Sequence, residues 1–161
     1  MAGNDMADII GDVIRREGGL NNDPADGGGR TDKGISEKAH PEAWKDGKVT
    51  EEEARAIYEM KYVTVPGFHQ VTDERLRAQL VDFGVNSGPT VAIMHLQRIL
   101  GVADDGVLGP VTLGVLNERM PFEVNLLLMG SRIKMIGRIV QKNPSQLKFL
   151  SGWLSRSLEF L

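Results

Sequence analysis

The chain has 161 residues, 41% of them hydrophobic, which is enough for one domain with a real core. Its 19 basic and 22 acidic residues give a formal net charge of −3 with no block of like charge, so we expect no nucleic-acid partner, which would need a basic stripe. Cysteine is absent and the three histidines (His40, His69 and His95) are scattered, which excludes disulfides and thiolate sites and makes a bound metal or other cofactor unexpected.

No export or membrane signal is visible in the sequence. The first residues carry acids where a secretory signal would carry bases, and their apolar positions are periodic rather than contiguous. The strongest later apolar run, VNLLLMG, is far shorter than the roughly 20 residues that a membrane span needs. We therefore expect a soluble protein without stable membrane insertion, which needs a separate route to any substrate outside the cytoplasm.

The first predicted element is an amphipathic helix that ends at a pair of glycines. Helical spacing relates the apolar residues Met6, Ile9, Ile10, Val13 and Ile14. Glu17 continues the same stripe, and Gly18 and Gly19 supply the left-handed residue that commonly closes a helix. From Asn21 to Ile35 the chain is dense in turn residues, with a short hairpin possible around RTDKGIS, residues 30–36.

The remainder of the sequence predicts helices. Thr50 and Glu53 match a capping box in front of a helix over residues 51–63, which Pro66 and Gly67 stop. Further helices are expected over 73–85, from Pro89 or Thr90 to Leu100, from Pro110 onward, over 122–141 and over 145–161. The predicted fold class is mainly α, with one small N-terminal lobe built from a loop or a β-hairpin.

Glu17 is the first candidate for chemistry. A carboxyl on the apolar side of a helix and at its carboxyl-terminal end loses hydration and meets negative partial charge, and both effects raise its pKa. A carboxyl that stays protonated near neutral pH can act as the general acid of glycoside hydrolysis. The loop that follows brings Asp23, Asp26, Thr31 and Asp32 within reach as polar partners. The alternatives are an ordinary surface loop and, less well supported because EF-hand spacing is missing, a calcium loop.

Three stretches resemble glycoside hydrolase family 108, which contains phage endolysins and related bacterial muramidases. EGGLNNDPADGGGRTDKGIS is similar to the family signature, in which Glu-Gly-Gly is followed by Asp-Pro-x-Asp-x-Gly-Gly-x-Thr-x-x-Gly-Ile. LVDFGVNSGPTVAIMHLQRILGVADDGVLGPVTLGVL resembles the family's C-terminal part, a predicted peptidoglycan-binding domain, and FLSGWLSRS resembles its closing segment. The resemblance runs from about Ile9 to Arg156.

The resemblance implies one lysozyme-like domain over residues 1–161, with a catalytic part over 9–90 and a helical part over 91–161. It implies hydrolysis of the β-1,4 bond between N-acetylmuramic acid and N-acetylglucosamine in peptidoglycan. Glu17 then corresponds to the catalytic acid, Asp26 to the stabilising group or base, and Thr31 to the residue that positions water. Asp23 and Asp32 remain rivals for the second catalytic group or contacts to substrate, and the stereochemistry stays open because it depends on the separation of the carboxyls.

Other residues are candidates for binding the glycan. Tyr62 and Trp153 could stack on sugars, although aromatic residues at helical positions more often lie in a core. Asn86 and Ser87 lie in the break between two helices, where they either contact glycan or cap the helices. Leu20 stands where relatives have an aromatic residue, and KYVTVPG stands where they have a Tyr-Trp-x-Pro-like segment.

We therefore expect a monomeric phage or prophage endolysin, a muramidase that lyses the host cell at phage release. It would stay in the host cytoplasm until a separate holin-type pore admits it to the periplasm and cell wall. The alternatives are a catalytically inactive peptidoglycan-binding or secretion-assisting module, and a lytic transglycosylase.

Overall fold

The first helix ends where the sequence predicts. The computed structural model describes residues 6–19 and 30–161, except for the side chains of residues 6–8, 16 and 17. Helix α1 (Met6–Glu17) buries Ile9, Ile10, Val13 and Ile14, and Gly18 follows with a positive φ of 80°. Because a positive φ strains residues with a Cβ atom, glycine suits this end of the helix.

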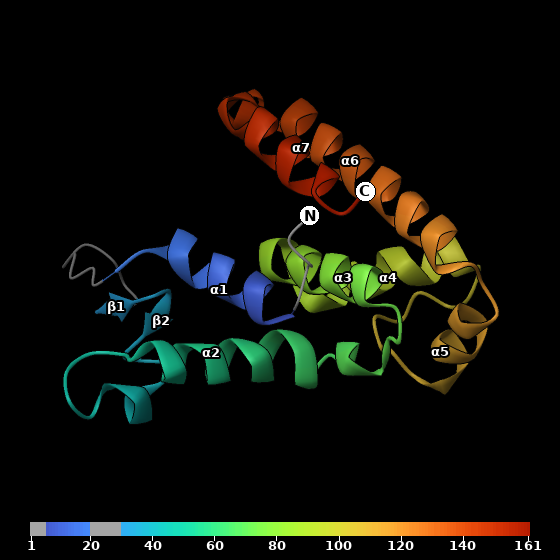
Figure 1. Ribbon diagram of the computed structural model, residues 1–161. Helices are drawn as coiled ribbons and strands as arrows, with labels where there is room; N and C mark the ends of the chain where they lie inside the picture. Colours follow the sequence, from blue (N-terminus) through green and yellow to red (C-terminus); the bar gives the residue numbers. More distant parts are fainter. Residues whose placement is uncertain (1–5, 20–29) are drawn as a thin grey trace.

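The predicted hairpin is confirmed. Strands β1 (Thr31–Asp32) and β2 (Ile35–Ser36) are antiparallel, with Thr31 opposite Ser36 and Asp32 opposite Ile35. The two turn residues, Lys33 and Gly34, both have positive φ, 51° and 74°. Two-residue hairpin turns of this kind match the twist of the strands. Figure 1 shows this small sheet beyond the carboxyl-terminal end of α1.

The segment after the hairpin departs in part from the predicted single helix over 51–63. Helix α2 (Glu51–Glu59) begins with the predicted capping box between Thr50 and Glu53, but from Met60 to Thr64 the backbone continues as a π-helix, η2. The 3₁₀ turns η1 (Pro41–Trp44) and η3 (Phe68–Gln70) were not predicted. Apolar spacing does not distinguish these hydrogen-bonding patterns over so few residues.

The other helices follow the predicted order. They are α3 (Glu74–Ser87), α4 (Pro89–Leu100), α5 (Pro110–Asn117), α6 (Pro121–Lys142) and α7 (Leu150–Leu158). The predicted last helix over 145–161 begins instead with 3₁₀ turns, η4 (Pro144–Phe149), and is α-helical only from Leu150. The fold is mainly α with a small hairpin lobe, as predicted, and no described helix is long and apolar enough to cross a membrane.

The connector between α4 and α5 is a tight turn built around one buried amide. Nε2 of Gln97 donates to Oδ1 of Asp105 at 2.7 Å and to the Val107 carbonyl at 3.0 Å, and Oε1 accepts from the Gly106 amide at 2.9 Å. Hydrogen bonds from the Val107 amide and Gln97 lower the pKa of Asp105. Gly106 has a positive φ of 75° and leaves no room for a Cβ atom, which would lie 2.5 Å from Cγ2 of Thr90.

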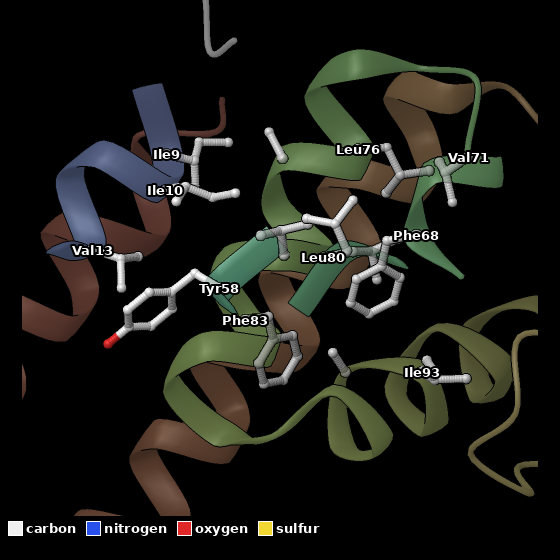
Figure 2. Packing of buried hydrophobic residues seen from close by; sticks show 14 of the residues in the cluster. Ile9, Ile10, Val13, Tyr58, Phe68, Val71, Leu76, Leu80, Phe83 and Ile93 are labelled. Atoms are coloured by element: carbon white, nitrogen blue, oxygen red, sulfur yellow. The ribbon is translucent and has the colours of Figure 1, made fainter. Parts of the chain in front are cut away.

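One cluster of buried hydrophobic residues extends from Ile9 in α1 to Phe160 near the end of the chain. Figure 2 shows Ile9, Ile10 and Val13 of α1 facing Tyr58 of α2, with Leu80 and Phe83 of α3 beside them. Helices α6 and α7 pack together, and α6 also contacts α3 and α4 (Figure 1). The buried cluster therefore contains residues from both parts of the chain, 9–90 and 91–161.

Candidate active site

The position of Glu17 is fixed by α1. It is the last residue of this helix and follows the buried residues Val13 and Ile14 at i+4 and i+3, so its Cα lies on the side that packs against α2 and α3. The side chain of Glu17 itself is outside the described part. At this end of a helix, the partial negative charge of the free carbonyl groups favours the neutral form of a carboxylic acid.

Asp32 anchors the hairpin rather than facing open solvent. Its buried carboxylate accepts a hydrogen bond from the Val49 amide at 3.0 Å and is 3.2 Å from Nζ of Lys33. The same ammonium group donates to the Val49 carbonyl at 2.7 Å. Tyr58 adds a hydrogen bond from its hydroxyl to the Lys33 carbonyl at 3.1 Å. These contacts fix the hairpin turn against α2 and the segment before it.

An ion pair closes the base of the hairpin. Arg30 donates from Nε and Nη2 to the two carboxylate oxygens of Glu37, at 2.8 and 2.6 Å, and these hydrogen bonds lower the pKa of Glu37. The Arg30 guanidinium also lies 5.0 Å from the ring centre of Trp44, which is buried. The hairpin that carries Thr31 is thus held both at its turn and at its base.

Thr31 and Asp32 occupy opposite faces of β1. Successive side chains of a strand point to opposite sides, and here Asp32 is buried while Thr31 is partly exposed. Thr31 is therefore accessible, whereas the oxygens of Asp32 are engaged. The other two carboxylates proposed for the site, Asp23 and Asp26, lie outside the described residues.

Tyr62 lies in a cavity between the hairpin and α2. Its ring stacks on Tyr58 with centroids 5.7 Å apart, and Nζ of Lys61 is 5.1 Å from the ring centre. The cavity has a volume of about 160 Å³ and is also lined by the hairpin residues Gly34, Ile35 and Ser36. Tyr62 is thus partly exposed beside the hairpin turn, on the π-helical segment η2.

Asn86 and Ser87 line a different cavity, of about 110 Å³, at the end of α3. The other residues that line it are Arg132, Met135, Ile136 and Ile139 of α6, and Trp153 and Arg156 of α7. The two cavities share no lining residue. The structure therefore brings Asn86, Ser87 and Trp153 together and places Tyr62 elsewhere.

A buried ionic cluster beneath this second cavity was not predicted. The Asp82 carboxylate accepts hydrogen bonds from Nη2 of Arg132 and from Nε of Arg156, each at 2.6 Å. Asn86 donates from its amide to the Asp82 carbonyl at 2.6 Å. The side chains of Asp82 and Arg132 are only 5% and 4% exposed. This cluster joins α3 to α6 and α7.

His69 and His95 line neither of these two cavities. Nδ1 of His95 is 2.7 Å from Oγ of Ser131 and its ring meets the Phe83 ring edge-on at 5.2 Å. Burial, followed by the charges of Arg98 and Arg138, lowers the pKa of His95. His95 is therefore a structural residue, as expected, whereas His69 is exposed.

Comparisons with known proteins divide the chain in two. Residues 10–88 match the family model described as Glycosyl hydrolase 108, and residues 91–158 match the model described as Predicted Peptidoglycan domain. Among solved structures, SagA of Brucella abortus is similar, with 28% identity over 96% of this chain and 94% of that chain and a TM-score of 0.67. No match is found among curated proteins.

The first match begins within α1 and covers the hairpin, α2 and α3, and therefore Glu17, Thr31 and Asp82. The second begins in α4 and covers the helices that bring Arg132, Trp153 and Arg156 to the cavity at the end of α3. The fold is lysozyme-like, and peptidoglycan is the polymer on which this glycoside hydrolase acts. The chain thus contains a glycosyl hydrolase 108 domain over residues 10–88, followed by a predicted peptidoglycan domain over residues 91–158.

Proposed function

We propose that this hydrolase is an N-acetylmuramidase that cleaves the β-1,4 bond between N-acetylmuramic acid and N-acetylglucosamine, with Glu17 as the general acid. The observation that carries the proposal is the place of Glu17 at the carboxyl-terminal end of α1, in line with the buried stripe of that helix. At this end of a helix the dipole favours a carboxyl that keeps its proton until it meets a leaving oxygen, and closing of the substrate over the carboxyl would add to this by removing water.

In this mechanism Glu17 protonates the glycosidic oxygen, and positive charge develops on the muramoyl ring as the bond breaks. Asp26 stabilises this charge or removes a proton from the attacking water, and Thr31, accessible on β1, holds that water. Asp23 is the remaining rival for the role of Asp26. Asp32 has a structural role instead, because its carboxylate is already bonded to the Val49 amide and Lys33.

The test of the acid is a comparison of wild type with Glu17→Gln on purified peptidoglycan, by turbidity and by zymogram. We expect activity to fall at least about 100-fold, since general acid catalysis contributes roughly that much or more. Glu52→Gln, at an exposed position in the first turn of α2, is the matched control and should keep full activity. Equal clearing by wild type and Glu17→Gln would reject the assignment.

Analysis of the products tests the bond and the reaction. New reducing ends on N-acetylmuramic acid are expected for a muramidase. A 1,6-anhydro product would indicate a lytic transglycosylase instead, and sedimentation with peptidoglycan without any released fragment would indicate an inactive binding module.

The three aspartates can be separated by measuring stability and activity together. Asp26→Asn should abolish most activity and leave the melting temperature unchanged. Asp32→Asn should lower the melting temperature, because it weakens an acceptor that is buried and bonded to Val49 and Lys33. Full activity of Asp26→Asn together with loss of activity in Asp23→Asn at unchanged stability would transfer the role to Asp23.

We also propose that the protein is a phage or prophage endolysin that acts as a monomer and lyses the host cell. It would remain in the host cytoplasm until a holin-type pore opens the membrane. Expression in bacteria should then leave cells intact until a pore-forming protein is co-expressed, and lysis should require Glu17. Lysis without any pore would contradict this part of the proposal.

A further inference from the structure

We propose that the cavity at the end of α3, called here the carboxylate pocket, binds a free carboxylate of the peptidoglycan stem peptide. The pocket is the one lined by Asn86, Ser87, Arg132, Met135, Ile136, Ile139, Trp153 and Arg156. The inference rests on the proposed function and adds to it, because the enzyme would then bind the stem peptide as well as the glycan.

The charge of the pocket favours an anion. Among the described residues, its lining contains two arginines and no carboxylate, and the acid bonded to these arginines is Asp82, beneath the pocket. Within the part of the chain that the structure describes, one carboxylate facing two guanidinium groups leaves one net positive charge. Within the described part of the chain, Nη1 of Arg132 is buried and has no hydrogen-bond partner. Because two guanidinium groups share one carboxylate in a largely buried setting, a second anion at this place is favoured.

Arg156 supplies the donor that a ligand can reach. Its side chain is 16% exposed against 4% for Arg132, so Arg132 contributes charge and Arg156 contributes contact. Nε and Nη2 of Arg156 both approach the same oxygen of Asp82, at 2.6 and 2.5 Å. For Nη1 of Arg156, no hydrogen bond is found among residues 30–161. A guanidinium with free donors is well suited to bind a carboxylate.

The residues that line the carboxylate pocket indicate which kind of ligand bears the carboxylate. Met135, Ile136 and Ile139 make one side apolar, Trp153 adds an aromatic face, and Ser87 supplies a hydroxyl. A volume of about 110 Å³ suits a small group such as an amino-acid residue rather than a sugar ring with its ring of hydroxyls. A carboxylate next to a methyl or methylene group meets both the arginines and the apolar wall. Stem peptides of peptidoglycan carry such groups, whereas the polar chain of a phosphate polymer would leave atoms unpaired against the isoleucines.

The binding experiment uses the Glu17→Gln full-length protein and a muropeptide, N-acetylglucosaminyl-N-acetylmuramoyl tetrapeptide. Its dissociation constant is compared, by calorimetry, with that of the same muropeptide whose peptide carboxylates are amidated. We expect the amidated form to bind about tenfold more weakly, the change that one charge-assisted hydrogen bond produces. The fluorescence of Trp153 should respond to the free carboxylate form, and this response should be lost in Trp153→Phe. Equal affinity for the two muropeptides would overturn the inference.

A charge change at the rim gives a second test that leaves the ionic cluster intact. Ile139 is 39% exposed, so it accepts a polar side chain at little cost in stability. Ile139→Glu should weaken binding of the carboxylate muropeptide about tenfold relative to the matched Ile139→Gln, and should not change binding of the amidated one. Equal effects of the two substitutions, or displacement of the muropeptide by glycerol phosphate polymer, would contradict a carboxylate site.

The results of these two binding tests do not depend on whether Glu17 is the general acid. Selective binding of the carboxylate muropeptide together with full lytic activity of Glu17→Gln would keep the pocket and reject Glu17. Loss of lysis in Glu17→Gln with unselective muropeptide binding would keep the muramidase and reject the pocket.

Discussion

Replacing Asp82 by asparagine should destabilise the protein strongly, because it removes the charge that two arginines share. Removing one partner of a buried ion pair costs roughly 3–5 kcal/mol. Asp82 and Arg132 are almost fully buried, while Arg156 is 16% exposed and partly hydrated, so we expect the lower part of that range, about 3–4 kcal/mol. For a domain of this size the melting temperature should fall by about 6–16 °C.

Urea unfolding followed by far-UV circular dichroism measures this loss, and the same substitution at a surface pair provides the control. Asp104 pairs with Arg98 at 2.6 Å, but these side chains are 46% and 52% exposed. Asp104→Asn should therefore change the free energy of unfolding by less than about 1 kcal/mol. If Asp82→Asn also costs less than about 1 kcal/mol, the buried cluster does not contribute the stability that its geometry implies.

The same variant also tests the single-domain prediction. Asp82 belongs to α3, whereas its partners belong to α6 and α7, so the cluster spans the two segments that match different family models. Wild type should unfold in one cooperative transition, and the double variant Asp82→Asn/Arg132→Met should recover part of the loss because it removes one stranded charge. Two separate transitions in the wild type would show that residues 91–161 form an independent unit.

Three further outcomes follow from local geometry. Gly106→Ala should lower the free energy of unfolding by about 1–3 kcal/mol, since its Cβ would lie 2.5 Å from Cγ2 of Thr90 and its φ is 75°; a melting temperature equal to that of the wild type would contradict this. Thr50→Ala should cost about 1 kcal/mol in urea unfolding because it removes the cap of α2, whereas Thr50→Ser should retain the cap. The folded state lowers the pKa of His95 from 6.5 by burial and by two nearby arginines, so protons bind more readily to the unfolded chain and stability should fall as pH drops below about 6.5. This part of the pH dependence should be absent from His95→Gln, and an unchanged profile in that variant would refute it.

The elements with local signals could be predicted from sequence. The stripe from Ile9 to Ile14, the capping box of Thr50 and the prolines at the first positions of α4 and α5 each depend on residues a few positions apart. The π-helix from Met60 to Thr64 and the 3₁₀ turns were missed for a physical reason. They differ from an α-helix by one residue in hydrogen-bond spacing, and the surrounding packing, not local propensity, selects among them.

The candidate site was predictable to the extent that its residues follow one another along the chain. Glu17 at a helix end and the hairpin with Thr31 are local features, and the structure places both as the sequence indicates. The separation of Tyr62 from Asn86 is not local, because it depends on which helices pack beside each residue. Trp153 reaches Asn86 only through the packing of α7 against α6.

One feature of the sequence indicates the ionic cluster, but hydrophobic periodicity does not identify its members. Asp82 lies between Val81 and Phe83, both fully buried, and a charged residue inside such a helix requires an opposite charge nearby. Its partners lie 50 and 74 residues further along the chain, on helices whose positions are set only by tertiary packing. Sequence reasoning could therefore have inferred that a buried cation exists without identifying Arg132 and Arg156. The same limit applies to the carboxylate pocket, because its positive charge arises from the count of two arginines against one aspartate, which only the packed helices bring together.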